Sequence, residues 1–379
     1  WSECVRTPVI GLLTAAVILA IPVASAMGAA AGVQDDRLPV TAPADLQARV
    51  DTLKSTGTKV TRVDLYWGAT APVRPVNPTD PNDPAYNWQW ADTIFSQLQT
   101  AGITPIVTTW NGPAWATGGK STGQPTWNAN GPVNAKDYAN FMQAVATRYN
   151  GKTNIPGFGP VMVKHYEVWN EPNLQLYMRP QYKRKTPLAG KKYAQMVNLT
   201  TPVVRAANPR AIVIAGVTGP KGKSDSTGRG TIDWYADLKK AGMKTYNAIS
   251  QHIYPAAAPT TKTTAIPSWS TFDKVIQAVN TLPGGKSKKI YVTESSYTTA
   301  KTPYRKVSVT PRQQAIYLKQ IWTLPVVKSS RVPLVMWFQL QDNPNWPGGL
   351  FLNSGGSKPS LAAFKSVAAA HRPTGSLAP

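Results

Sequence analysis

Short runs of β-branched residues alternate with longer amphipathic segments along this chain, and this rhythm constrains the fold more than any other feature. Eight strand-and-helix units follow one another, the first strand starting at Ala31 and the last helix near Ser360. Such alternation is typical of a parallel sheet whose strands are joined by crossover helices. A closed (β/α)8 barrel uses about 250 residues and accepts long loops after its strands. The 379 residues therefore predict one α/β domain, a TIM barrel with long βα loops.

The expected strands cover 31–35, 59–66, 103–109, 161–170, 211–215, 247–252, 289–293 and 332–339. The expected helices cover 44–55, 88–101, 135–149, 190–207, 232–241 and 271–280, and two more begin near Thr310 and Ser360. Glycine follows several of these helices, and Pro311 stands at the first helical position, where proline is favoured. No block of residues is left for a second domain.

The amino-terminal segment has the pattern of a secretory signal. Val9 to Ala24 is apolar, Arg6 precedes it, and Ala24-Ser25-Ala26 offers small residues for cleavage. We expect residues 1–26 to be a signal peptide and 27–379 a catalytic domain that is secreted or held at the cell surface. The apolar run approaches the ~18 residues of a membrane span, so an uncleaved anchor is the alternative. Stable membrane association is expected only in that case.

Composition limits the partners and cofactors. The formal charge is +23, from 41 Lys and Arg against 18 Asp and Glu. Such a surface attracts anionic polymers, although a non-specific basic coat explains the charge equally well. The basic residues are dispersed and no nucleic-acid-binding motif is present, so no nucleic-acid partner is expected. Cys4 is the one cysteine, and the three histidines show no metal-ligand spacing, so we expect no metal and no cofactor. No oligomeric state is indicated.

Two of the four glutamates end predicted strands beside residues that stop a strand. Glu171 follows Asn170 and precedes Pro172, and Glu294 is followed by small polar residues. Active sites of TIM barrels lie at the carboxyl ends of the strands, so both carboxylates are expected on the catalytic rim. Two such carboxylates are the minimum equipment for cleaving a glycosidic bond, with Glu171 and Glu294 as the catalytic pair.

Each of these residues also has a purely structural interpretation. A carboxylate at a strand end can cap the next helix, and Glu167, four residues before Glu171, is expected to form a buried salt bridge. Arg62 could belong to a core ion pair, and His252 could be a hydrogen-bonded core histidine. Trp67, Trp115 and Trp337 fall near predicted strand ends, where an indole can stack on a sugar or pack in the core.

At these residues the sequence resembles the retaining glycoside hydrolases with (β/α)8 barrels, known as clan A. The run Tyr-Glu-Val-Trp-Asn-Glu-Pro-Asn, which ends at Asn173, is similar to glycoside hydrolase family 39 and its cellulase-like neighbours. Further matches are Thr-Arg-Val-Asp-Leu-Tyr-Trp around Arg62, Gly-Pro-Ala-Trp115, Gln-His-Ile-Tyr-Pro255, Gly349-Leu-Phe and Lys358-Pro. The resemblance covers most of the chain after the signal. One departure is Thr-Glu-Ser-Ser-Tyr297, which lacks the tryptophan or glycine often found after the nucleophile.

The resemblance implies a role for each matching residue. Glu171 would be the general acid and then base, and Glu294 the nucleophile. The substrate-binding residues would be Asn170, Arg62, His252, Tyr254, Trp337, Trp115 and Trp67. Among these, Asn170 would donate to the sugar 2-hydroxyl, Arg62 would keep Glu294 ionised, His252 and Tyr254 would line the floor, and Trp337 would lie under the reacting sugar.

The expected partner is a carbohydrate, cleaved with retention, which requires carboxyl groups about 5 to 5.5 Å apart. Many basic residues fall in loops of the catalytic side, among them Lys183, Lys223 and Lys301, which favours an anionic polysaccharide. The alternative function is a non-catalytic glycan-binding barrel or a cell-surface adhesin, because the fold does not fix the function.

Overall fold

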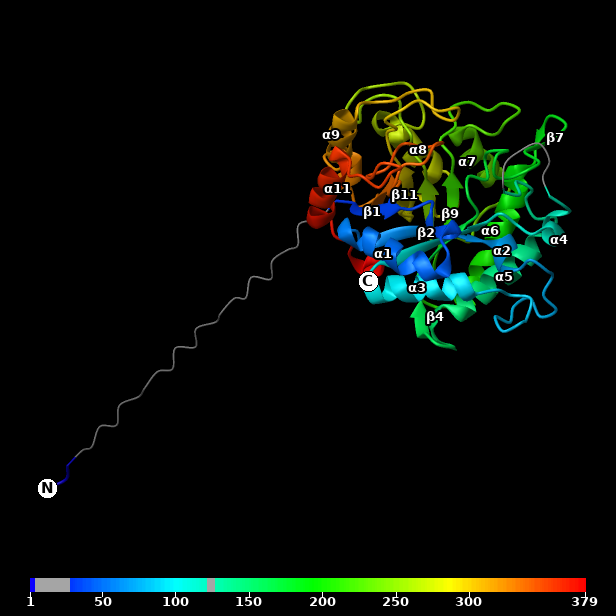
Figure 1. Cartoon of the computed structure of the whole chain (residues 1–379), viewed down its shortest axis with the longest axis horizontal. Coiled ribbons are helices and arrows are strands. Elements are labelled where there is room, and N and C mark those ends of the chain that lie inside the picture. Colours follow the sequence, from blue (N-terminus) through cyan, green and yellow to red (C-terminus); the bar gives the residue numbers. More distant parts are fainter. Residues whose placement is uncertain (4–27, 121–126) are drawn as a thin grey trace.

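The computed structural model describes residues 1–3, 28–120 and 127–379. Those from residue 28 onward form a closed barrel of parallel strands with helices around it (Figure 1). Around the barrel the strands follow the order β1, β12, β11, β10, β9, β6, β3, β2. They are β1 (Ala30–Gln34), β2 (Val60–Tyr66), β3 (Thr104–Trp110), β6 (His165–Val168), β9 (Ile212–Thr218), β10 (Ala248–Gln251), β11 (Ile290–Ser295) and β12 (Leu334–Phe338). The predicted TIM barrel is confirmed.

The longer helices connect successive barrel strands, except the last one, which follows β12. They are α1 (Leu46–Ser55), α3 (Gln89–Ala101), α5 (Ala135–Arg148), α6 (Ala189–Ala207), α7 (Thr231–Lys240), α8 (Phe272–Asn280), α9 (Pro311–Ile321) and α11 (Pro359–Ala370). Short helices α2 (Trp67–Thr70), α4 (Ala114–Thr117) and α10 (Pro325–Lys328) were not predicted from the sequence. Pro311 does begin α9, after Thr310, whose side chain and that of Gln313 form a capping box.

Two apolar layers hold the barrel together. Inside it, near the amino ends of the strands, lies a small cluster that includes Val60, Ile106 and Met336. Between the strands and the helices lies a much larger cluster, which contains Val335 and Trp337. Neighbouring residues of one strand thus serve different layers, because successive side chains of a strand point to opposite faces.

The predicted strand over 161–170 is wrong in one respect, because two elements share it. β5 (Gly159–Met162) pairs antiparallel with β4 (Asn150–Ile155), and the barrel strand β6 starts only at His165. Gly157 and Gly159 have φ of 80° and 71°, which lets the chain reverse between β4 and β5. A second hairpin, β7 (Tyr182–Lys183) with β8 (Thr186–Pro187), lies in the loop after β6.

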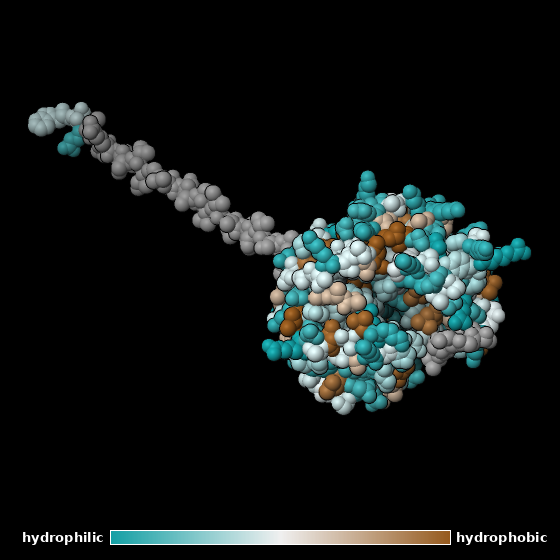
Figure 2. All heavy atoms as spheres, turned by 90° about the horizontal axis from the view of Figure 1, so that it is seen from above, coloured by the Kyte–Doolittle hydropathy of each residue, from teal (hydrophilic) through white to brown (hydrophobic). Residues whose placement is uncertain are grey.

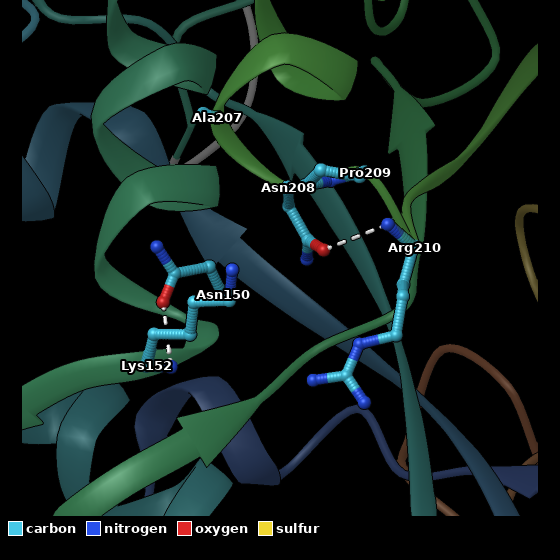
Figure 3. Close-up of a pocket in the computed structure, with 6 residues that line it drawn as sticks. All are labelled: Asn150, Lys152, Ala207, Asn208, Pro209 and Arg210. Atoms are coloured by element: carbon cyan, nitrogen blue, oxygen red, sulfur yellow. Dashed lines mark hydrogen bonds between the residues drawn. The ribbon is translucent and has the colours of Figure 1, made fainter.

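The two ends of the barrel differ. β9 and β11 point upward in Figure 1, towards the face that Figure 2 views from above, and this largely hydrophilic face is hollowed near its centre. At the other end, Asn150 and Lys152 line a separate hollow together with 207–210, the connection before β9 (Figure 3). A connection before a strand lies at the amino end of the barrel, so this second hollow is remote from the strand ends that carry TIM-barrel active sites.

The predicted signal segment cannot be compared with the structure, because 4–27 lie outside the described residues. Among the helices of the described ranges, none is both long enough and apolar enough to cross a bilayer.

Candidate active site

The ends of β6 and β11 bring the two predicted carboxylates together. Beyond β6 the backbone turns sharply, since Trp169 and Glu171 have φ of 66° and 38°, in the left-handed region that side-chain-bearing residues rarely adopt. Strained backbone of this kind tends to occur at functional sites. Glu171 and Glu294 are each 7% exposed, so both carboxyls are largely withdrawn from solvent.

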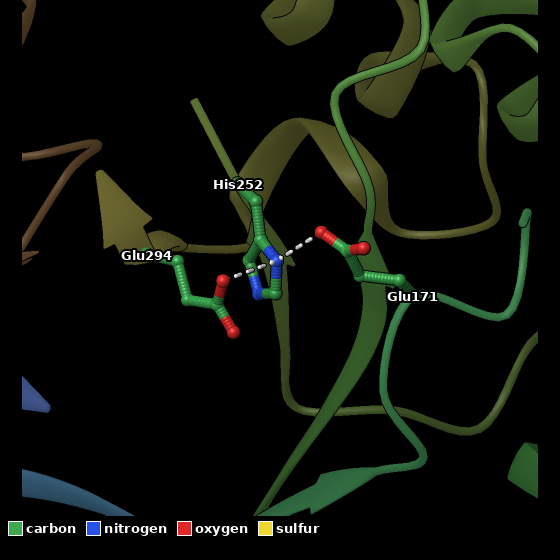
Figure 4. A group of neighbouring side chains, drawn as sticks. All are labelled: Glu171, His252 and Glu294. Atoms are coloured by element: carbon green, nitrogen blue, oxygen red, sulfur yellow. Dashed lines mark hydrogen bonds and ion pairs between the residues drawn. The ribbon is translucent and has the colours of Figure 1, made fainter. Parts of the chain in front are cut away.

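A histidine from the end of β10 lies between the two carboxyls (Figure 4). Nδ1 of His252 is 2.8 Å from Oε1 of Glu171 and 3.4 Å from Oε2 of Glu294. One ligand atom from each of the three residues lies within 4.8 Å of the others, so an oxygen of Glu171 is this close to one of Glu294. This short separation matches retaining glycosidases, whereas inversion requires roughly 6.5 to 9.5 Å.

Arg62 donates hydrogen bonds to one of these carboxylates and to three further side chains around it. Its guanidinium binds Oε1 of Glu294 at 2.6 Å through Nη1 and Oε2 of Glu167 at 2.5 Å through Nε. The same group donates to Oδ1 of Asn170 at 2.8 Å and to Oε1 of Gln34 at 3.0 Å. The expected salt bridge of Glu167 is therefore confirmed. The guanidinium links residues of β1, β2, β6 and β11 and the segment after β6, so it fixes the nucleophile relative to Asn170.

The two carboxyls have different neighbours, although burial raises the pKa of both. Burial raises the pKa of Glu171 to about 7, only partly opposed by Arg62. Burial also raises the pKa of Glu294, but His252 and Arg62 oppose this, and the hydroxyl of Tyr254 donates to Oε2 of Glu294 at 2.6 Å. Two close donors favour the ionised form of Glu294. Burial lowers the pKa of His252, and the charge of Glu294 opposes this. The arrangement suits a proton donor at Glu171 and a nucleophile at Glu294.

Asn170 and Tyr254 both lie near Glu294, since Asn170 shares Arg62 with it and Tyr254 donates to it directly. Asn170 gives its amide oxygen to Arg62, which turns the amide nitrogen away from the guanidinium. Burial raises the pKa of Tyr254 well above its ordinary value, and the charge of Glu294 adds to this, so its hydroxyl keeps its proton.

The three predicted tryptophans differ in whether their rings are accessible to a sugar. Trp67 is 0% exposed and stacks on Phe141 in the helix layer, and Trp337 is 1% exposed with its indole donating to the carbonyl of Gly348. Neither can offer a face to a sugar, so both expectations are corrected. Trp115 is half-buried, so it stays a candidate for contact with a sugar on the rim. The guanidinium of Arg74 lies 4.5 Å from its ring centroid.

Sequence reasoning missed Phe338, the neighbour of Trp337. The register pairs Phe338 with Gln34, one residue beyond the pair formed by Trp337 and Val33. Its ring lies 5.9 Å from that of Tyr254 and 5.7 Å from that of Trp346. The alternation of side chains along β12 was the signal that could have selected Phe338 instead of Trp337.

A wall of aromatic rings lies on the β2 and β3 side, and its loop members Trp127 and Tyr177 were missed. Trp110 packs edge-on against Tyr66 and Tyr177, with centroids 5.3 Å away in both cases, and Trp127 stacks on Tyr177 at 5.7 Å. The carboxylates of Glu171 and Glu294 contribute to raising the pKa of the Tyr177 phenol, after burial, which places this wall beside the catalytic pair.

Within the described ranges, Glu171, His252 and Glu294 are also the group whose donors could share a metal ion. An ion there would occupy the position between the two carboxyls where a proton donor and a nucleophile need to meet a substrate. The site's chemistry is therefore better explained by proton transfer and nucleophilic attack.

The basic residues expected on the rim fall into two groups. Arg229 pairs with Asp237 at 2.6 Å, Lys221 with Asp225 at 2.8 Å, and Arg305 donates to backbone carbonyls of the segment after β10. Six others are exposed in three loops at the carboxyl ends of strands: Lys183, Arg184, Lys185, Lys223, Lys301 and Lys306.

Comparison with known proteins gives a family and a fold. The model of the family "Glycosyl hydrolases family 39" matches residues 74–365. No curated protein sequence matches the chain.

Solved structures similar to this one include a family 39 glycoside hydrolase from Bacteroides cellulosilyticus WH2, at 20% identity and a TM-score of 0.61. A monomeric β-xylosidase from Caulobacter crescentus CB15 has 18% identity and a TM-score of 0.59. An endo-β-1,4-mannanase from Thermotoga petrophila has 12% identity and a TM-score of 0.56. The matches cover 91%, 89% and 91% of this chain, which spans 64%, 67% and 77% of those proteins. At these identities the likeness concerns the fold.

Proposed function

Because the chain belongs to glycosyl hydrolases family 39, we propose that it is a retaining glycosidase that cleaves an O-glycosidic bond by double displacement, with Glu294 as nucleophile and Glu171 as acid and base. The observation that carries the proposal is the pair itself: two buried carboxyls with oxygens within 4.8 Å, of which Glu294 is held by Arg62 and Tyr254 and Glu171 has a pKa raised to about 7. This spacing favours a covalent intermediate over direct attack by water.

In the first step the protonated Glu171 gives its proton to the leaving oxygen while a carboxylate oxygen of Glu294 attacks the anomeric carbon. The bond between that carbon and the leaving oxygen breaks, and an ester to Glu294 forms. The negative charge of Glu294 is then lost. Arg62 keeps Glu167 as an ionic partner, so the buried guanidinium is not left unpaired.

In the second step the roles of Glu171 reverse. With Glu294 esterified, the neighbouring negative charge no longer favours the protonated form of Glu171, and its carboxylate can take a proton from water. The water oxygen attacks the anomeric carbon, the ester bond breaks and Glu294 is released. His252 contacts both carboxyls and orients them through the two steps.

Two finer features belong to the same proposal. The first is an anionic polysaccharide as substrate, supported by the six exposed basic residues around the catalytic face. The second is secretion, supported by the apolar segment that precedes residue 27. The amino-terminal sequence of protein recovered from the culture medium tests the second; a chain retained in the cell with residues 1–26 intact would contradict it.

The direct test of the catalytic pair is covalent trapping. Incubation with fluoro-sugar inactivators, followed by intact mass spectrometry and peptide mapping, should place the label on Glu294. The variant Glu294→Gln should take no label. A label on another residue would overturn the assignment of the nucleophile, and no label across a broad panel of sugars would favour a glycan-binding barrel without catalysis.

A further inference from the structure

A third carboxylate lies above Arg62, and the mechanism does not use it. Asp64 follows Arg62 by two positions on β2, so the alternation of side chains puts both on the inner face, with Asp64 nearer the mouth of the barrel. Asp64 is 8% exposed, and its Oδ1 is buried with no hydrogen-bond donor among the described residues. Its recorded ion-pair partner is Nη1 of Arg62 at 3.8 Å, and that nitrogen already binds Glu294.

A fourth carboxylate adjoins it from the neighbouring strand. Asp36 lies just after β1, and its Oδ1 accepts a hydrogen bond of 3.0 Å from Gln34, whose amide oxygen is bound to Arg62. Burial raises the pKa of Asp36 well above its ordinary value, and the charges of Asp64 and Glu294 raise it further. Arg62 thus pairs with Asp64, Glu167 and Glu294, and Asp36 is linked to it through Gln34.

We propose that Asp64 and Asp36 form a specificity site for the reacting sugar, which accepts hydrogen bonds from hydroxyl or ammonium groups of that sugar and excludes a sugar carboxylate. The proposal rests on the proposed glycosidase function. A buried carboxylate oxygen without a donor is costly, and a donor supplied by the ligand removes that cost. A uronic acid would instead add a negative charge to a site where Arg62 is already shared by Glu167, Glu294 and Asp64.

This inference refines the idea of an anionic substrate. The exposed basic residues lie on the rim, in the loops after β6, β9 and β11, while the carboxylates lie inside the strands. The rim is therefore positively charged, whereas the side chains around the reacting sugar are mostly acidic. The polymer that suits both regions carries its anionic groups on sugars away from the scissile bond and presents an uncharged or amino sugar to Glu294.

The test uses matched sets of 5-fluoroglycosyl fluorides of both anomeric configurations, in which each hexose is accompanied by its uronic acid and its amino sugar. The rate of labelling of Glu294 is measured by intact mass spectrometry. The hexose or the amino sugar should label the enzyme at least about a hundredfold faster than the matched uronic acid, since like charges about 5 Å apart in such a site repel by that order. The faster of the two shows whether a hydroxyl or an ammonium group is preferred.

The variant Asp64→Asn should lower the hexose to uronic acid ratio at least about tenfold, because it removes the repulsion of the uronic acid and weakens an acceptor for the hexose. Asp36→Asn should change the ratio less than Asp64→Asn, because the raised pKa of Asp36 favours its uncharged form, and Asp45→Asn, which removes an exposed carboxylate, should leave it unchanged. A role in stability alone would lower both rates together. Equal or faster labelling by the uronic acid, or an unchanged ratio in both pocket variants, would overturn the inference. Failure of every sugar to label the wild-type protein would instead contradict the proposed function itself.

Discussion

Glu171 differs from an ordinary glutamate in holding its proton up to about neutral pH, since burial raises its pKa to about 7. The protonated form is the one that can act as general acid, so kcat/KM should fall as pH rises above about 7. A profile from about pH 4 to about pH 9 measures this limb, since kcat/KM reports the pKa values of the free enzyme. A dinitrophenyl leaving group needs no proton, and with it the alkaline limb should disappear. A limb that persisted would assign the titration to another residue.

The same raised pKa affects stability. An unfolded glutamate ionises near 4.5, whereas Glu171 in the folded protein ionises near 7. Between these values the folded state binds the additional proton, so stability falls as pH rises through this window, by up to about 3 kcal/mol from this group. Glu171→Gln removes the penalty. Urea unfolding should therefore show a larger stabilisation by this variant at about pH 8 than at about pH 4, by an amount of that order.

The exposed carboxylate of Asp45 provides the control for that measurement. Asp45→Asn should shift the free energy of unfolding by nearly the same small amount at both pH values. A Glu171→Gln effect that did not depend on pH would show that folding does not raise the pKa of this carboxyl.

For single elements, most of the correct predictions came from the hydrophobic periodicity of the segments and from their position in the barrel. Eight strands were placed because β-branched runs recur between amphipathic segments, and Glu171 and Glu294 were placed because strands of a parallel barrel end on one rim. The β4 and β5 hairpin was missed because β4 is mostly polar, and because the apolar Val161 and Met162 of β5 were joined to β6 in one predicted strand. Short helices such as α2 and α4 were missed because a single turn leaves no period to detect.

The errors at the site are errors of one residue along a strand. Trp337 and Phe338 are both aromatic, and only the phase of β12 decides which one faces the barrel mouth and which one the helices. Gln34 and Asp64 could have been found by the same alternation, starting from Arg62 on the inner face. The aromatic wall of Trp110 and Tyr177 joins a strand end to a loop, and loop conformation is not contained in a strand pattern.

The capping box of α9 gives an element-scale prediction. Thr310 accepts a hydrogen bond from the backbone of Gln313, whose side chain in turn accepts one from the backbone of Thr310. Thr310→Ala should lower the free energy of unfolding by about 1 kcal/mol, without a change in kcat, because the carboxylates belong to other elements. Thermal unfolding and a progress curve measure the two quantities. A loss of kcat at unchanged stability would show that α9 positions Glu294 through Tyr297, whose carbonyl Gln314 binds.

For the whole molecule, the +23 charge predicts a dependence on salt that only a charged polymer should reveal. Replacing Lys183, Arg184 and Lys185 by Gln should lower kcat/KM for an anionic polysaccharide and flatten its decline between about 0.05 and 0.5 M NaCl, because salt screens such attraction. Cleavage of a small neutral glycoside should not change. The control replaces Lys239, Lys240 and Lys244, which are exposed at the opposite end of the barrel. Equal effects of the two triple variants would mean that net charge, and not the rim, is responsible.

The guanidinium of Arg62 also makes activity depend on one event in folding, the closure of the barrel. It lies on β2 and holds Glu294 of β11, an element formed from a part of the chain 232 residues away. β1 and β12 separate these strands around the barrel, so this contact spans the place where the ends of the sheet meet. Until that ring is closed, the nucleophile has no cation beside it. The rate at which enzyme activity returns after dilution from denaturant would thus report the rate of barrel closure, without a spectroscopic probe.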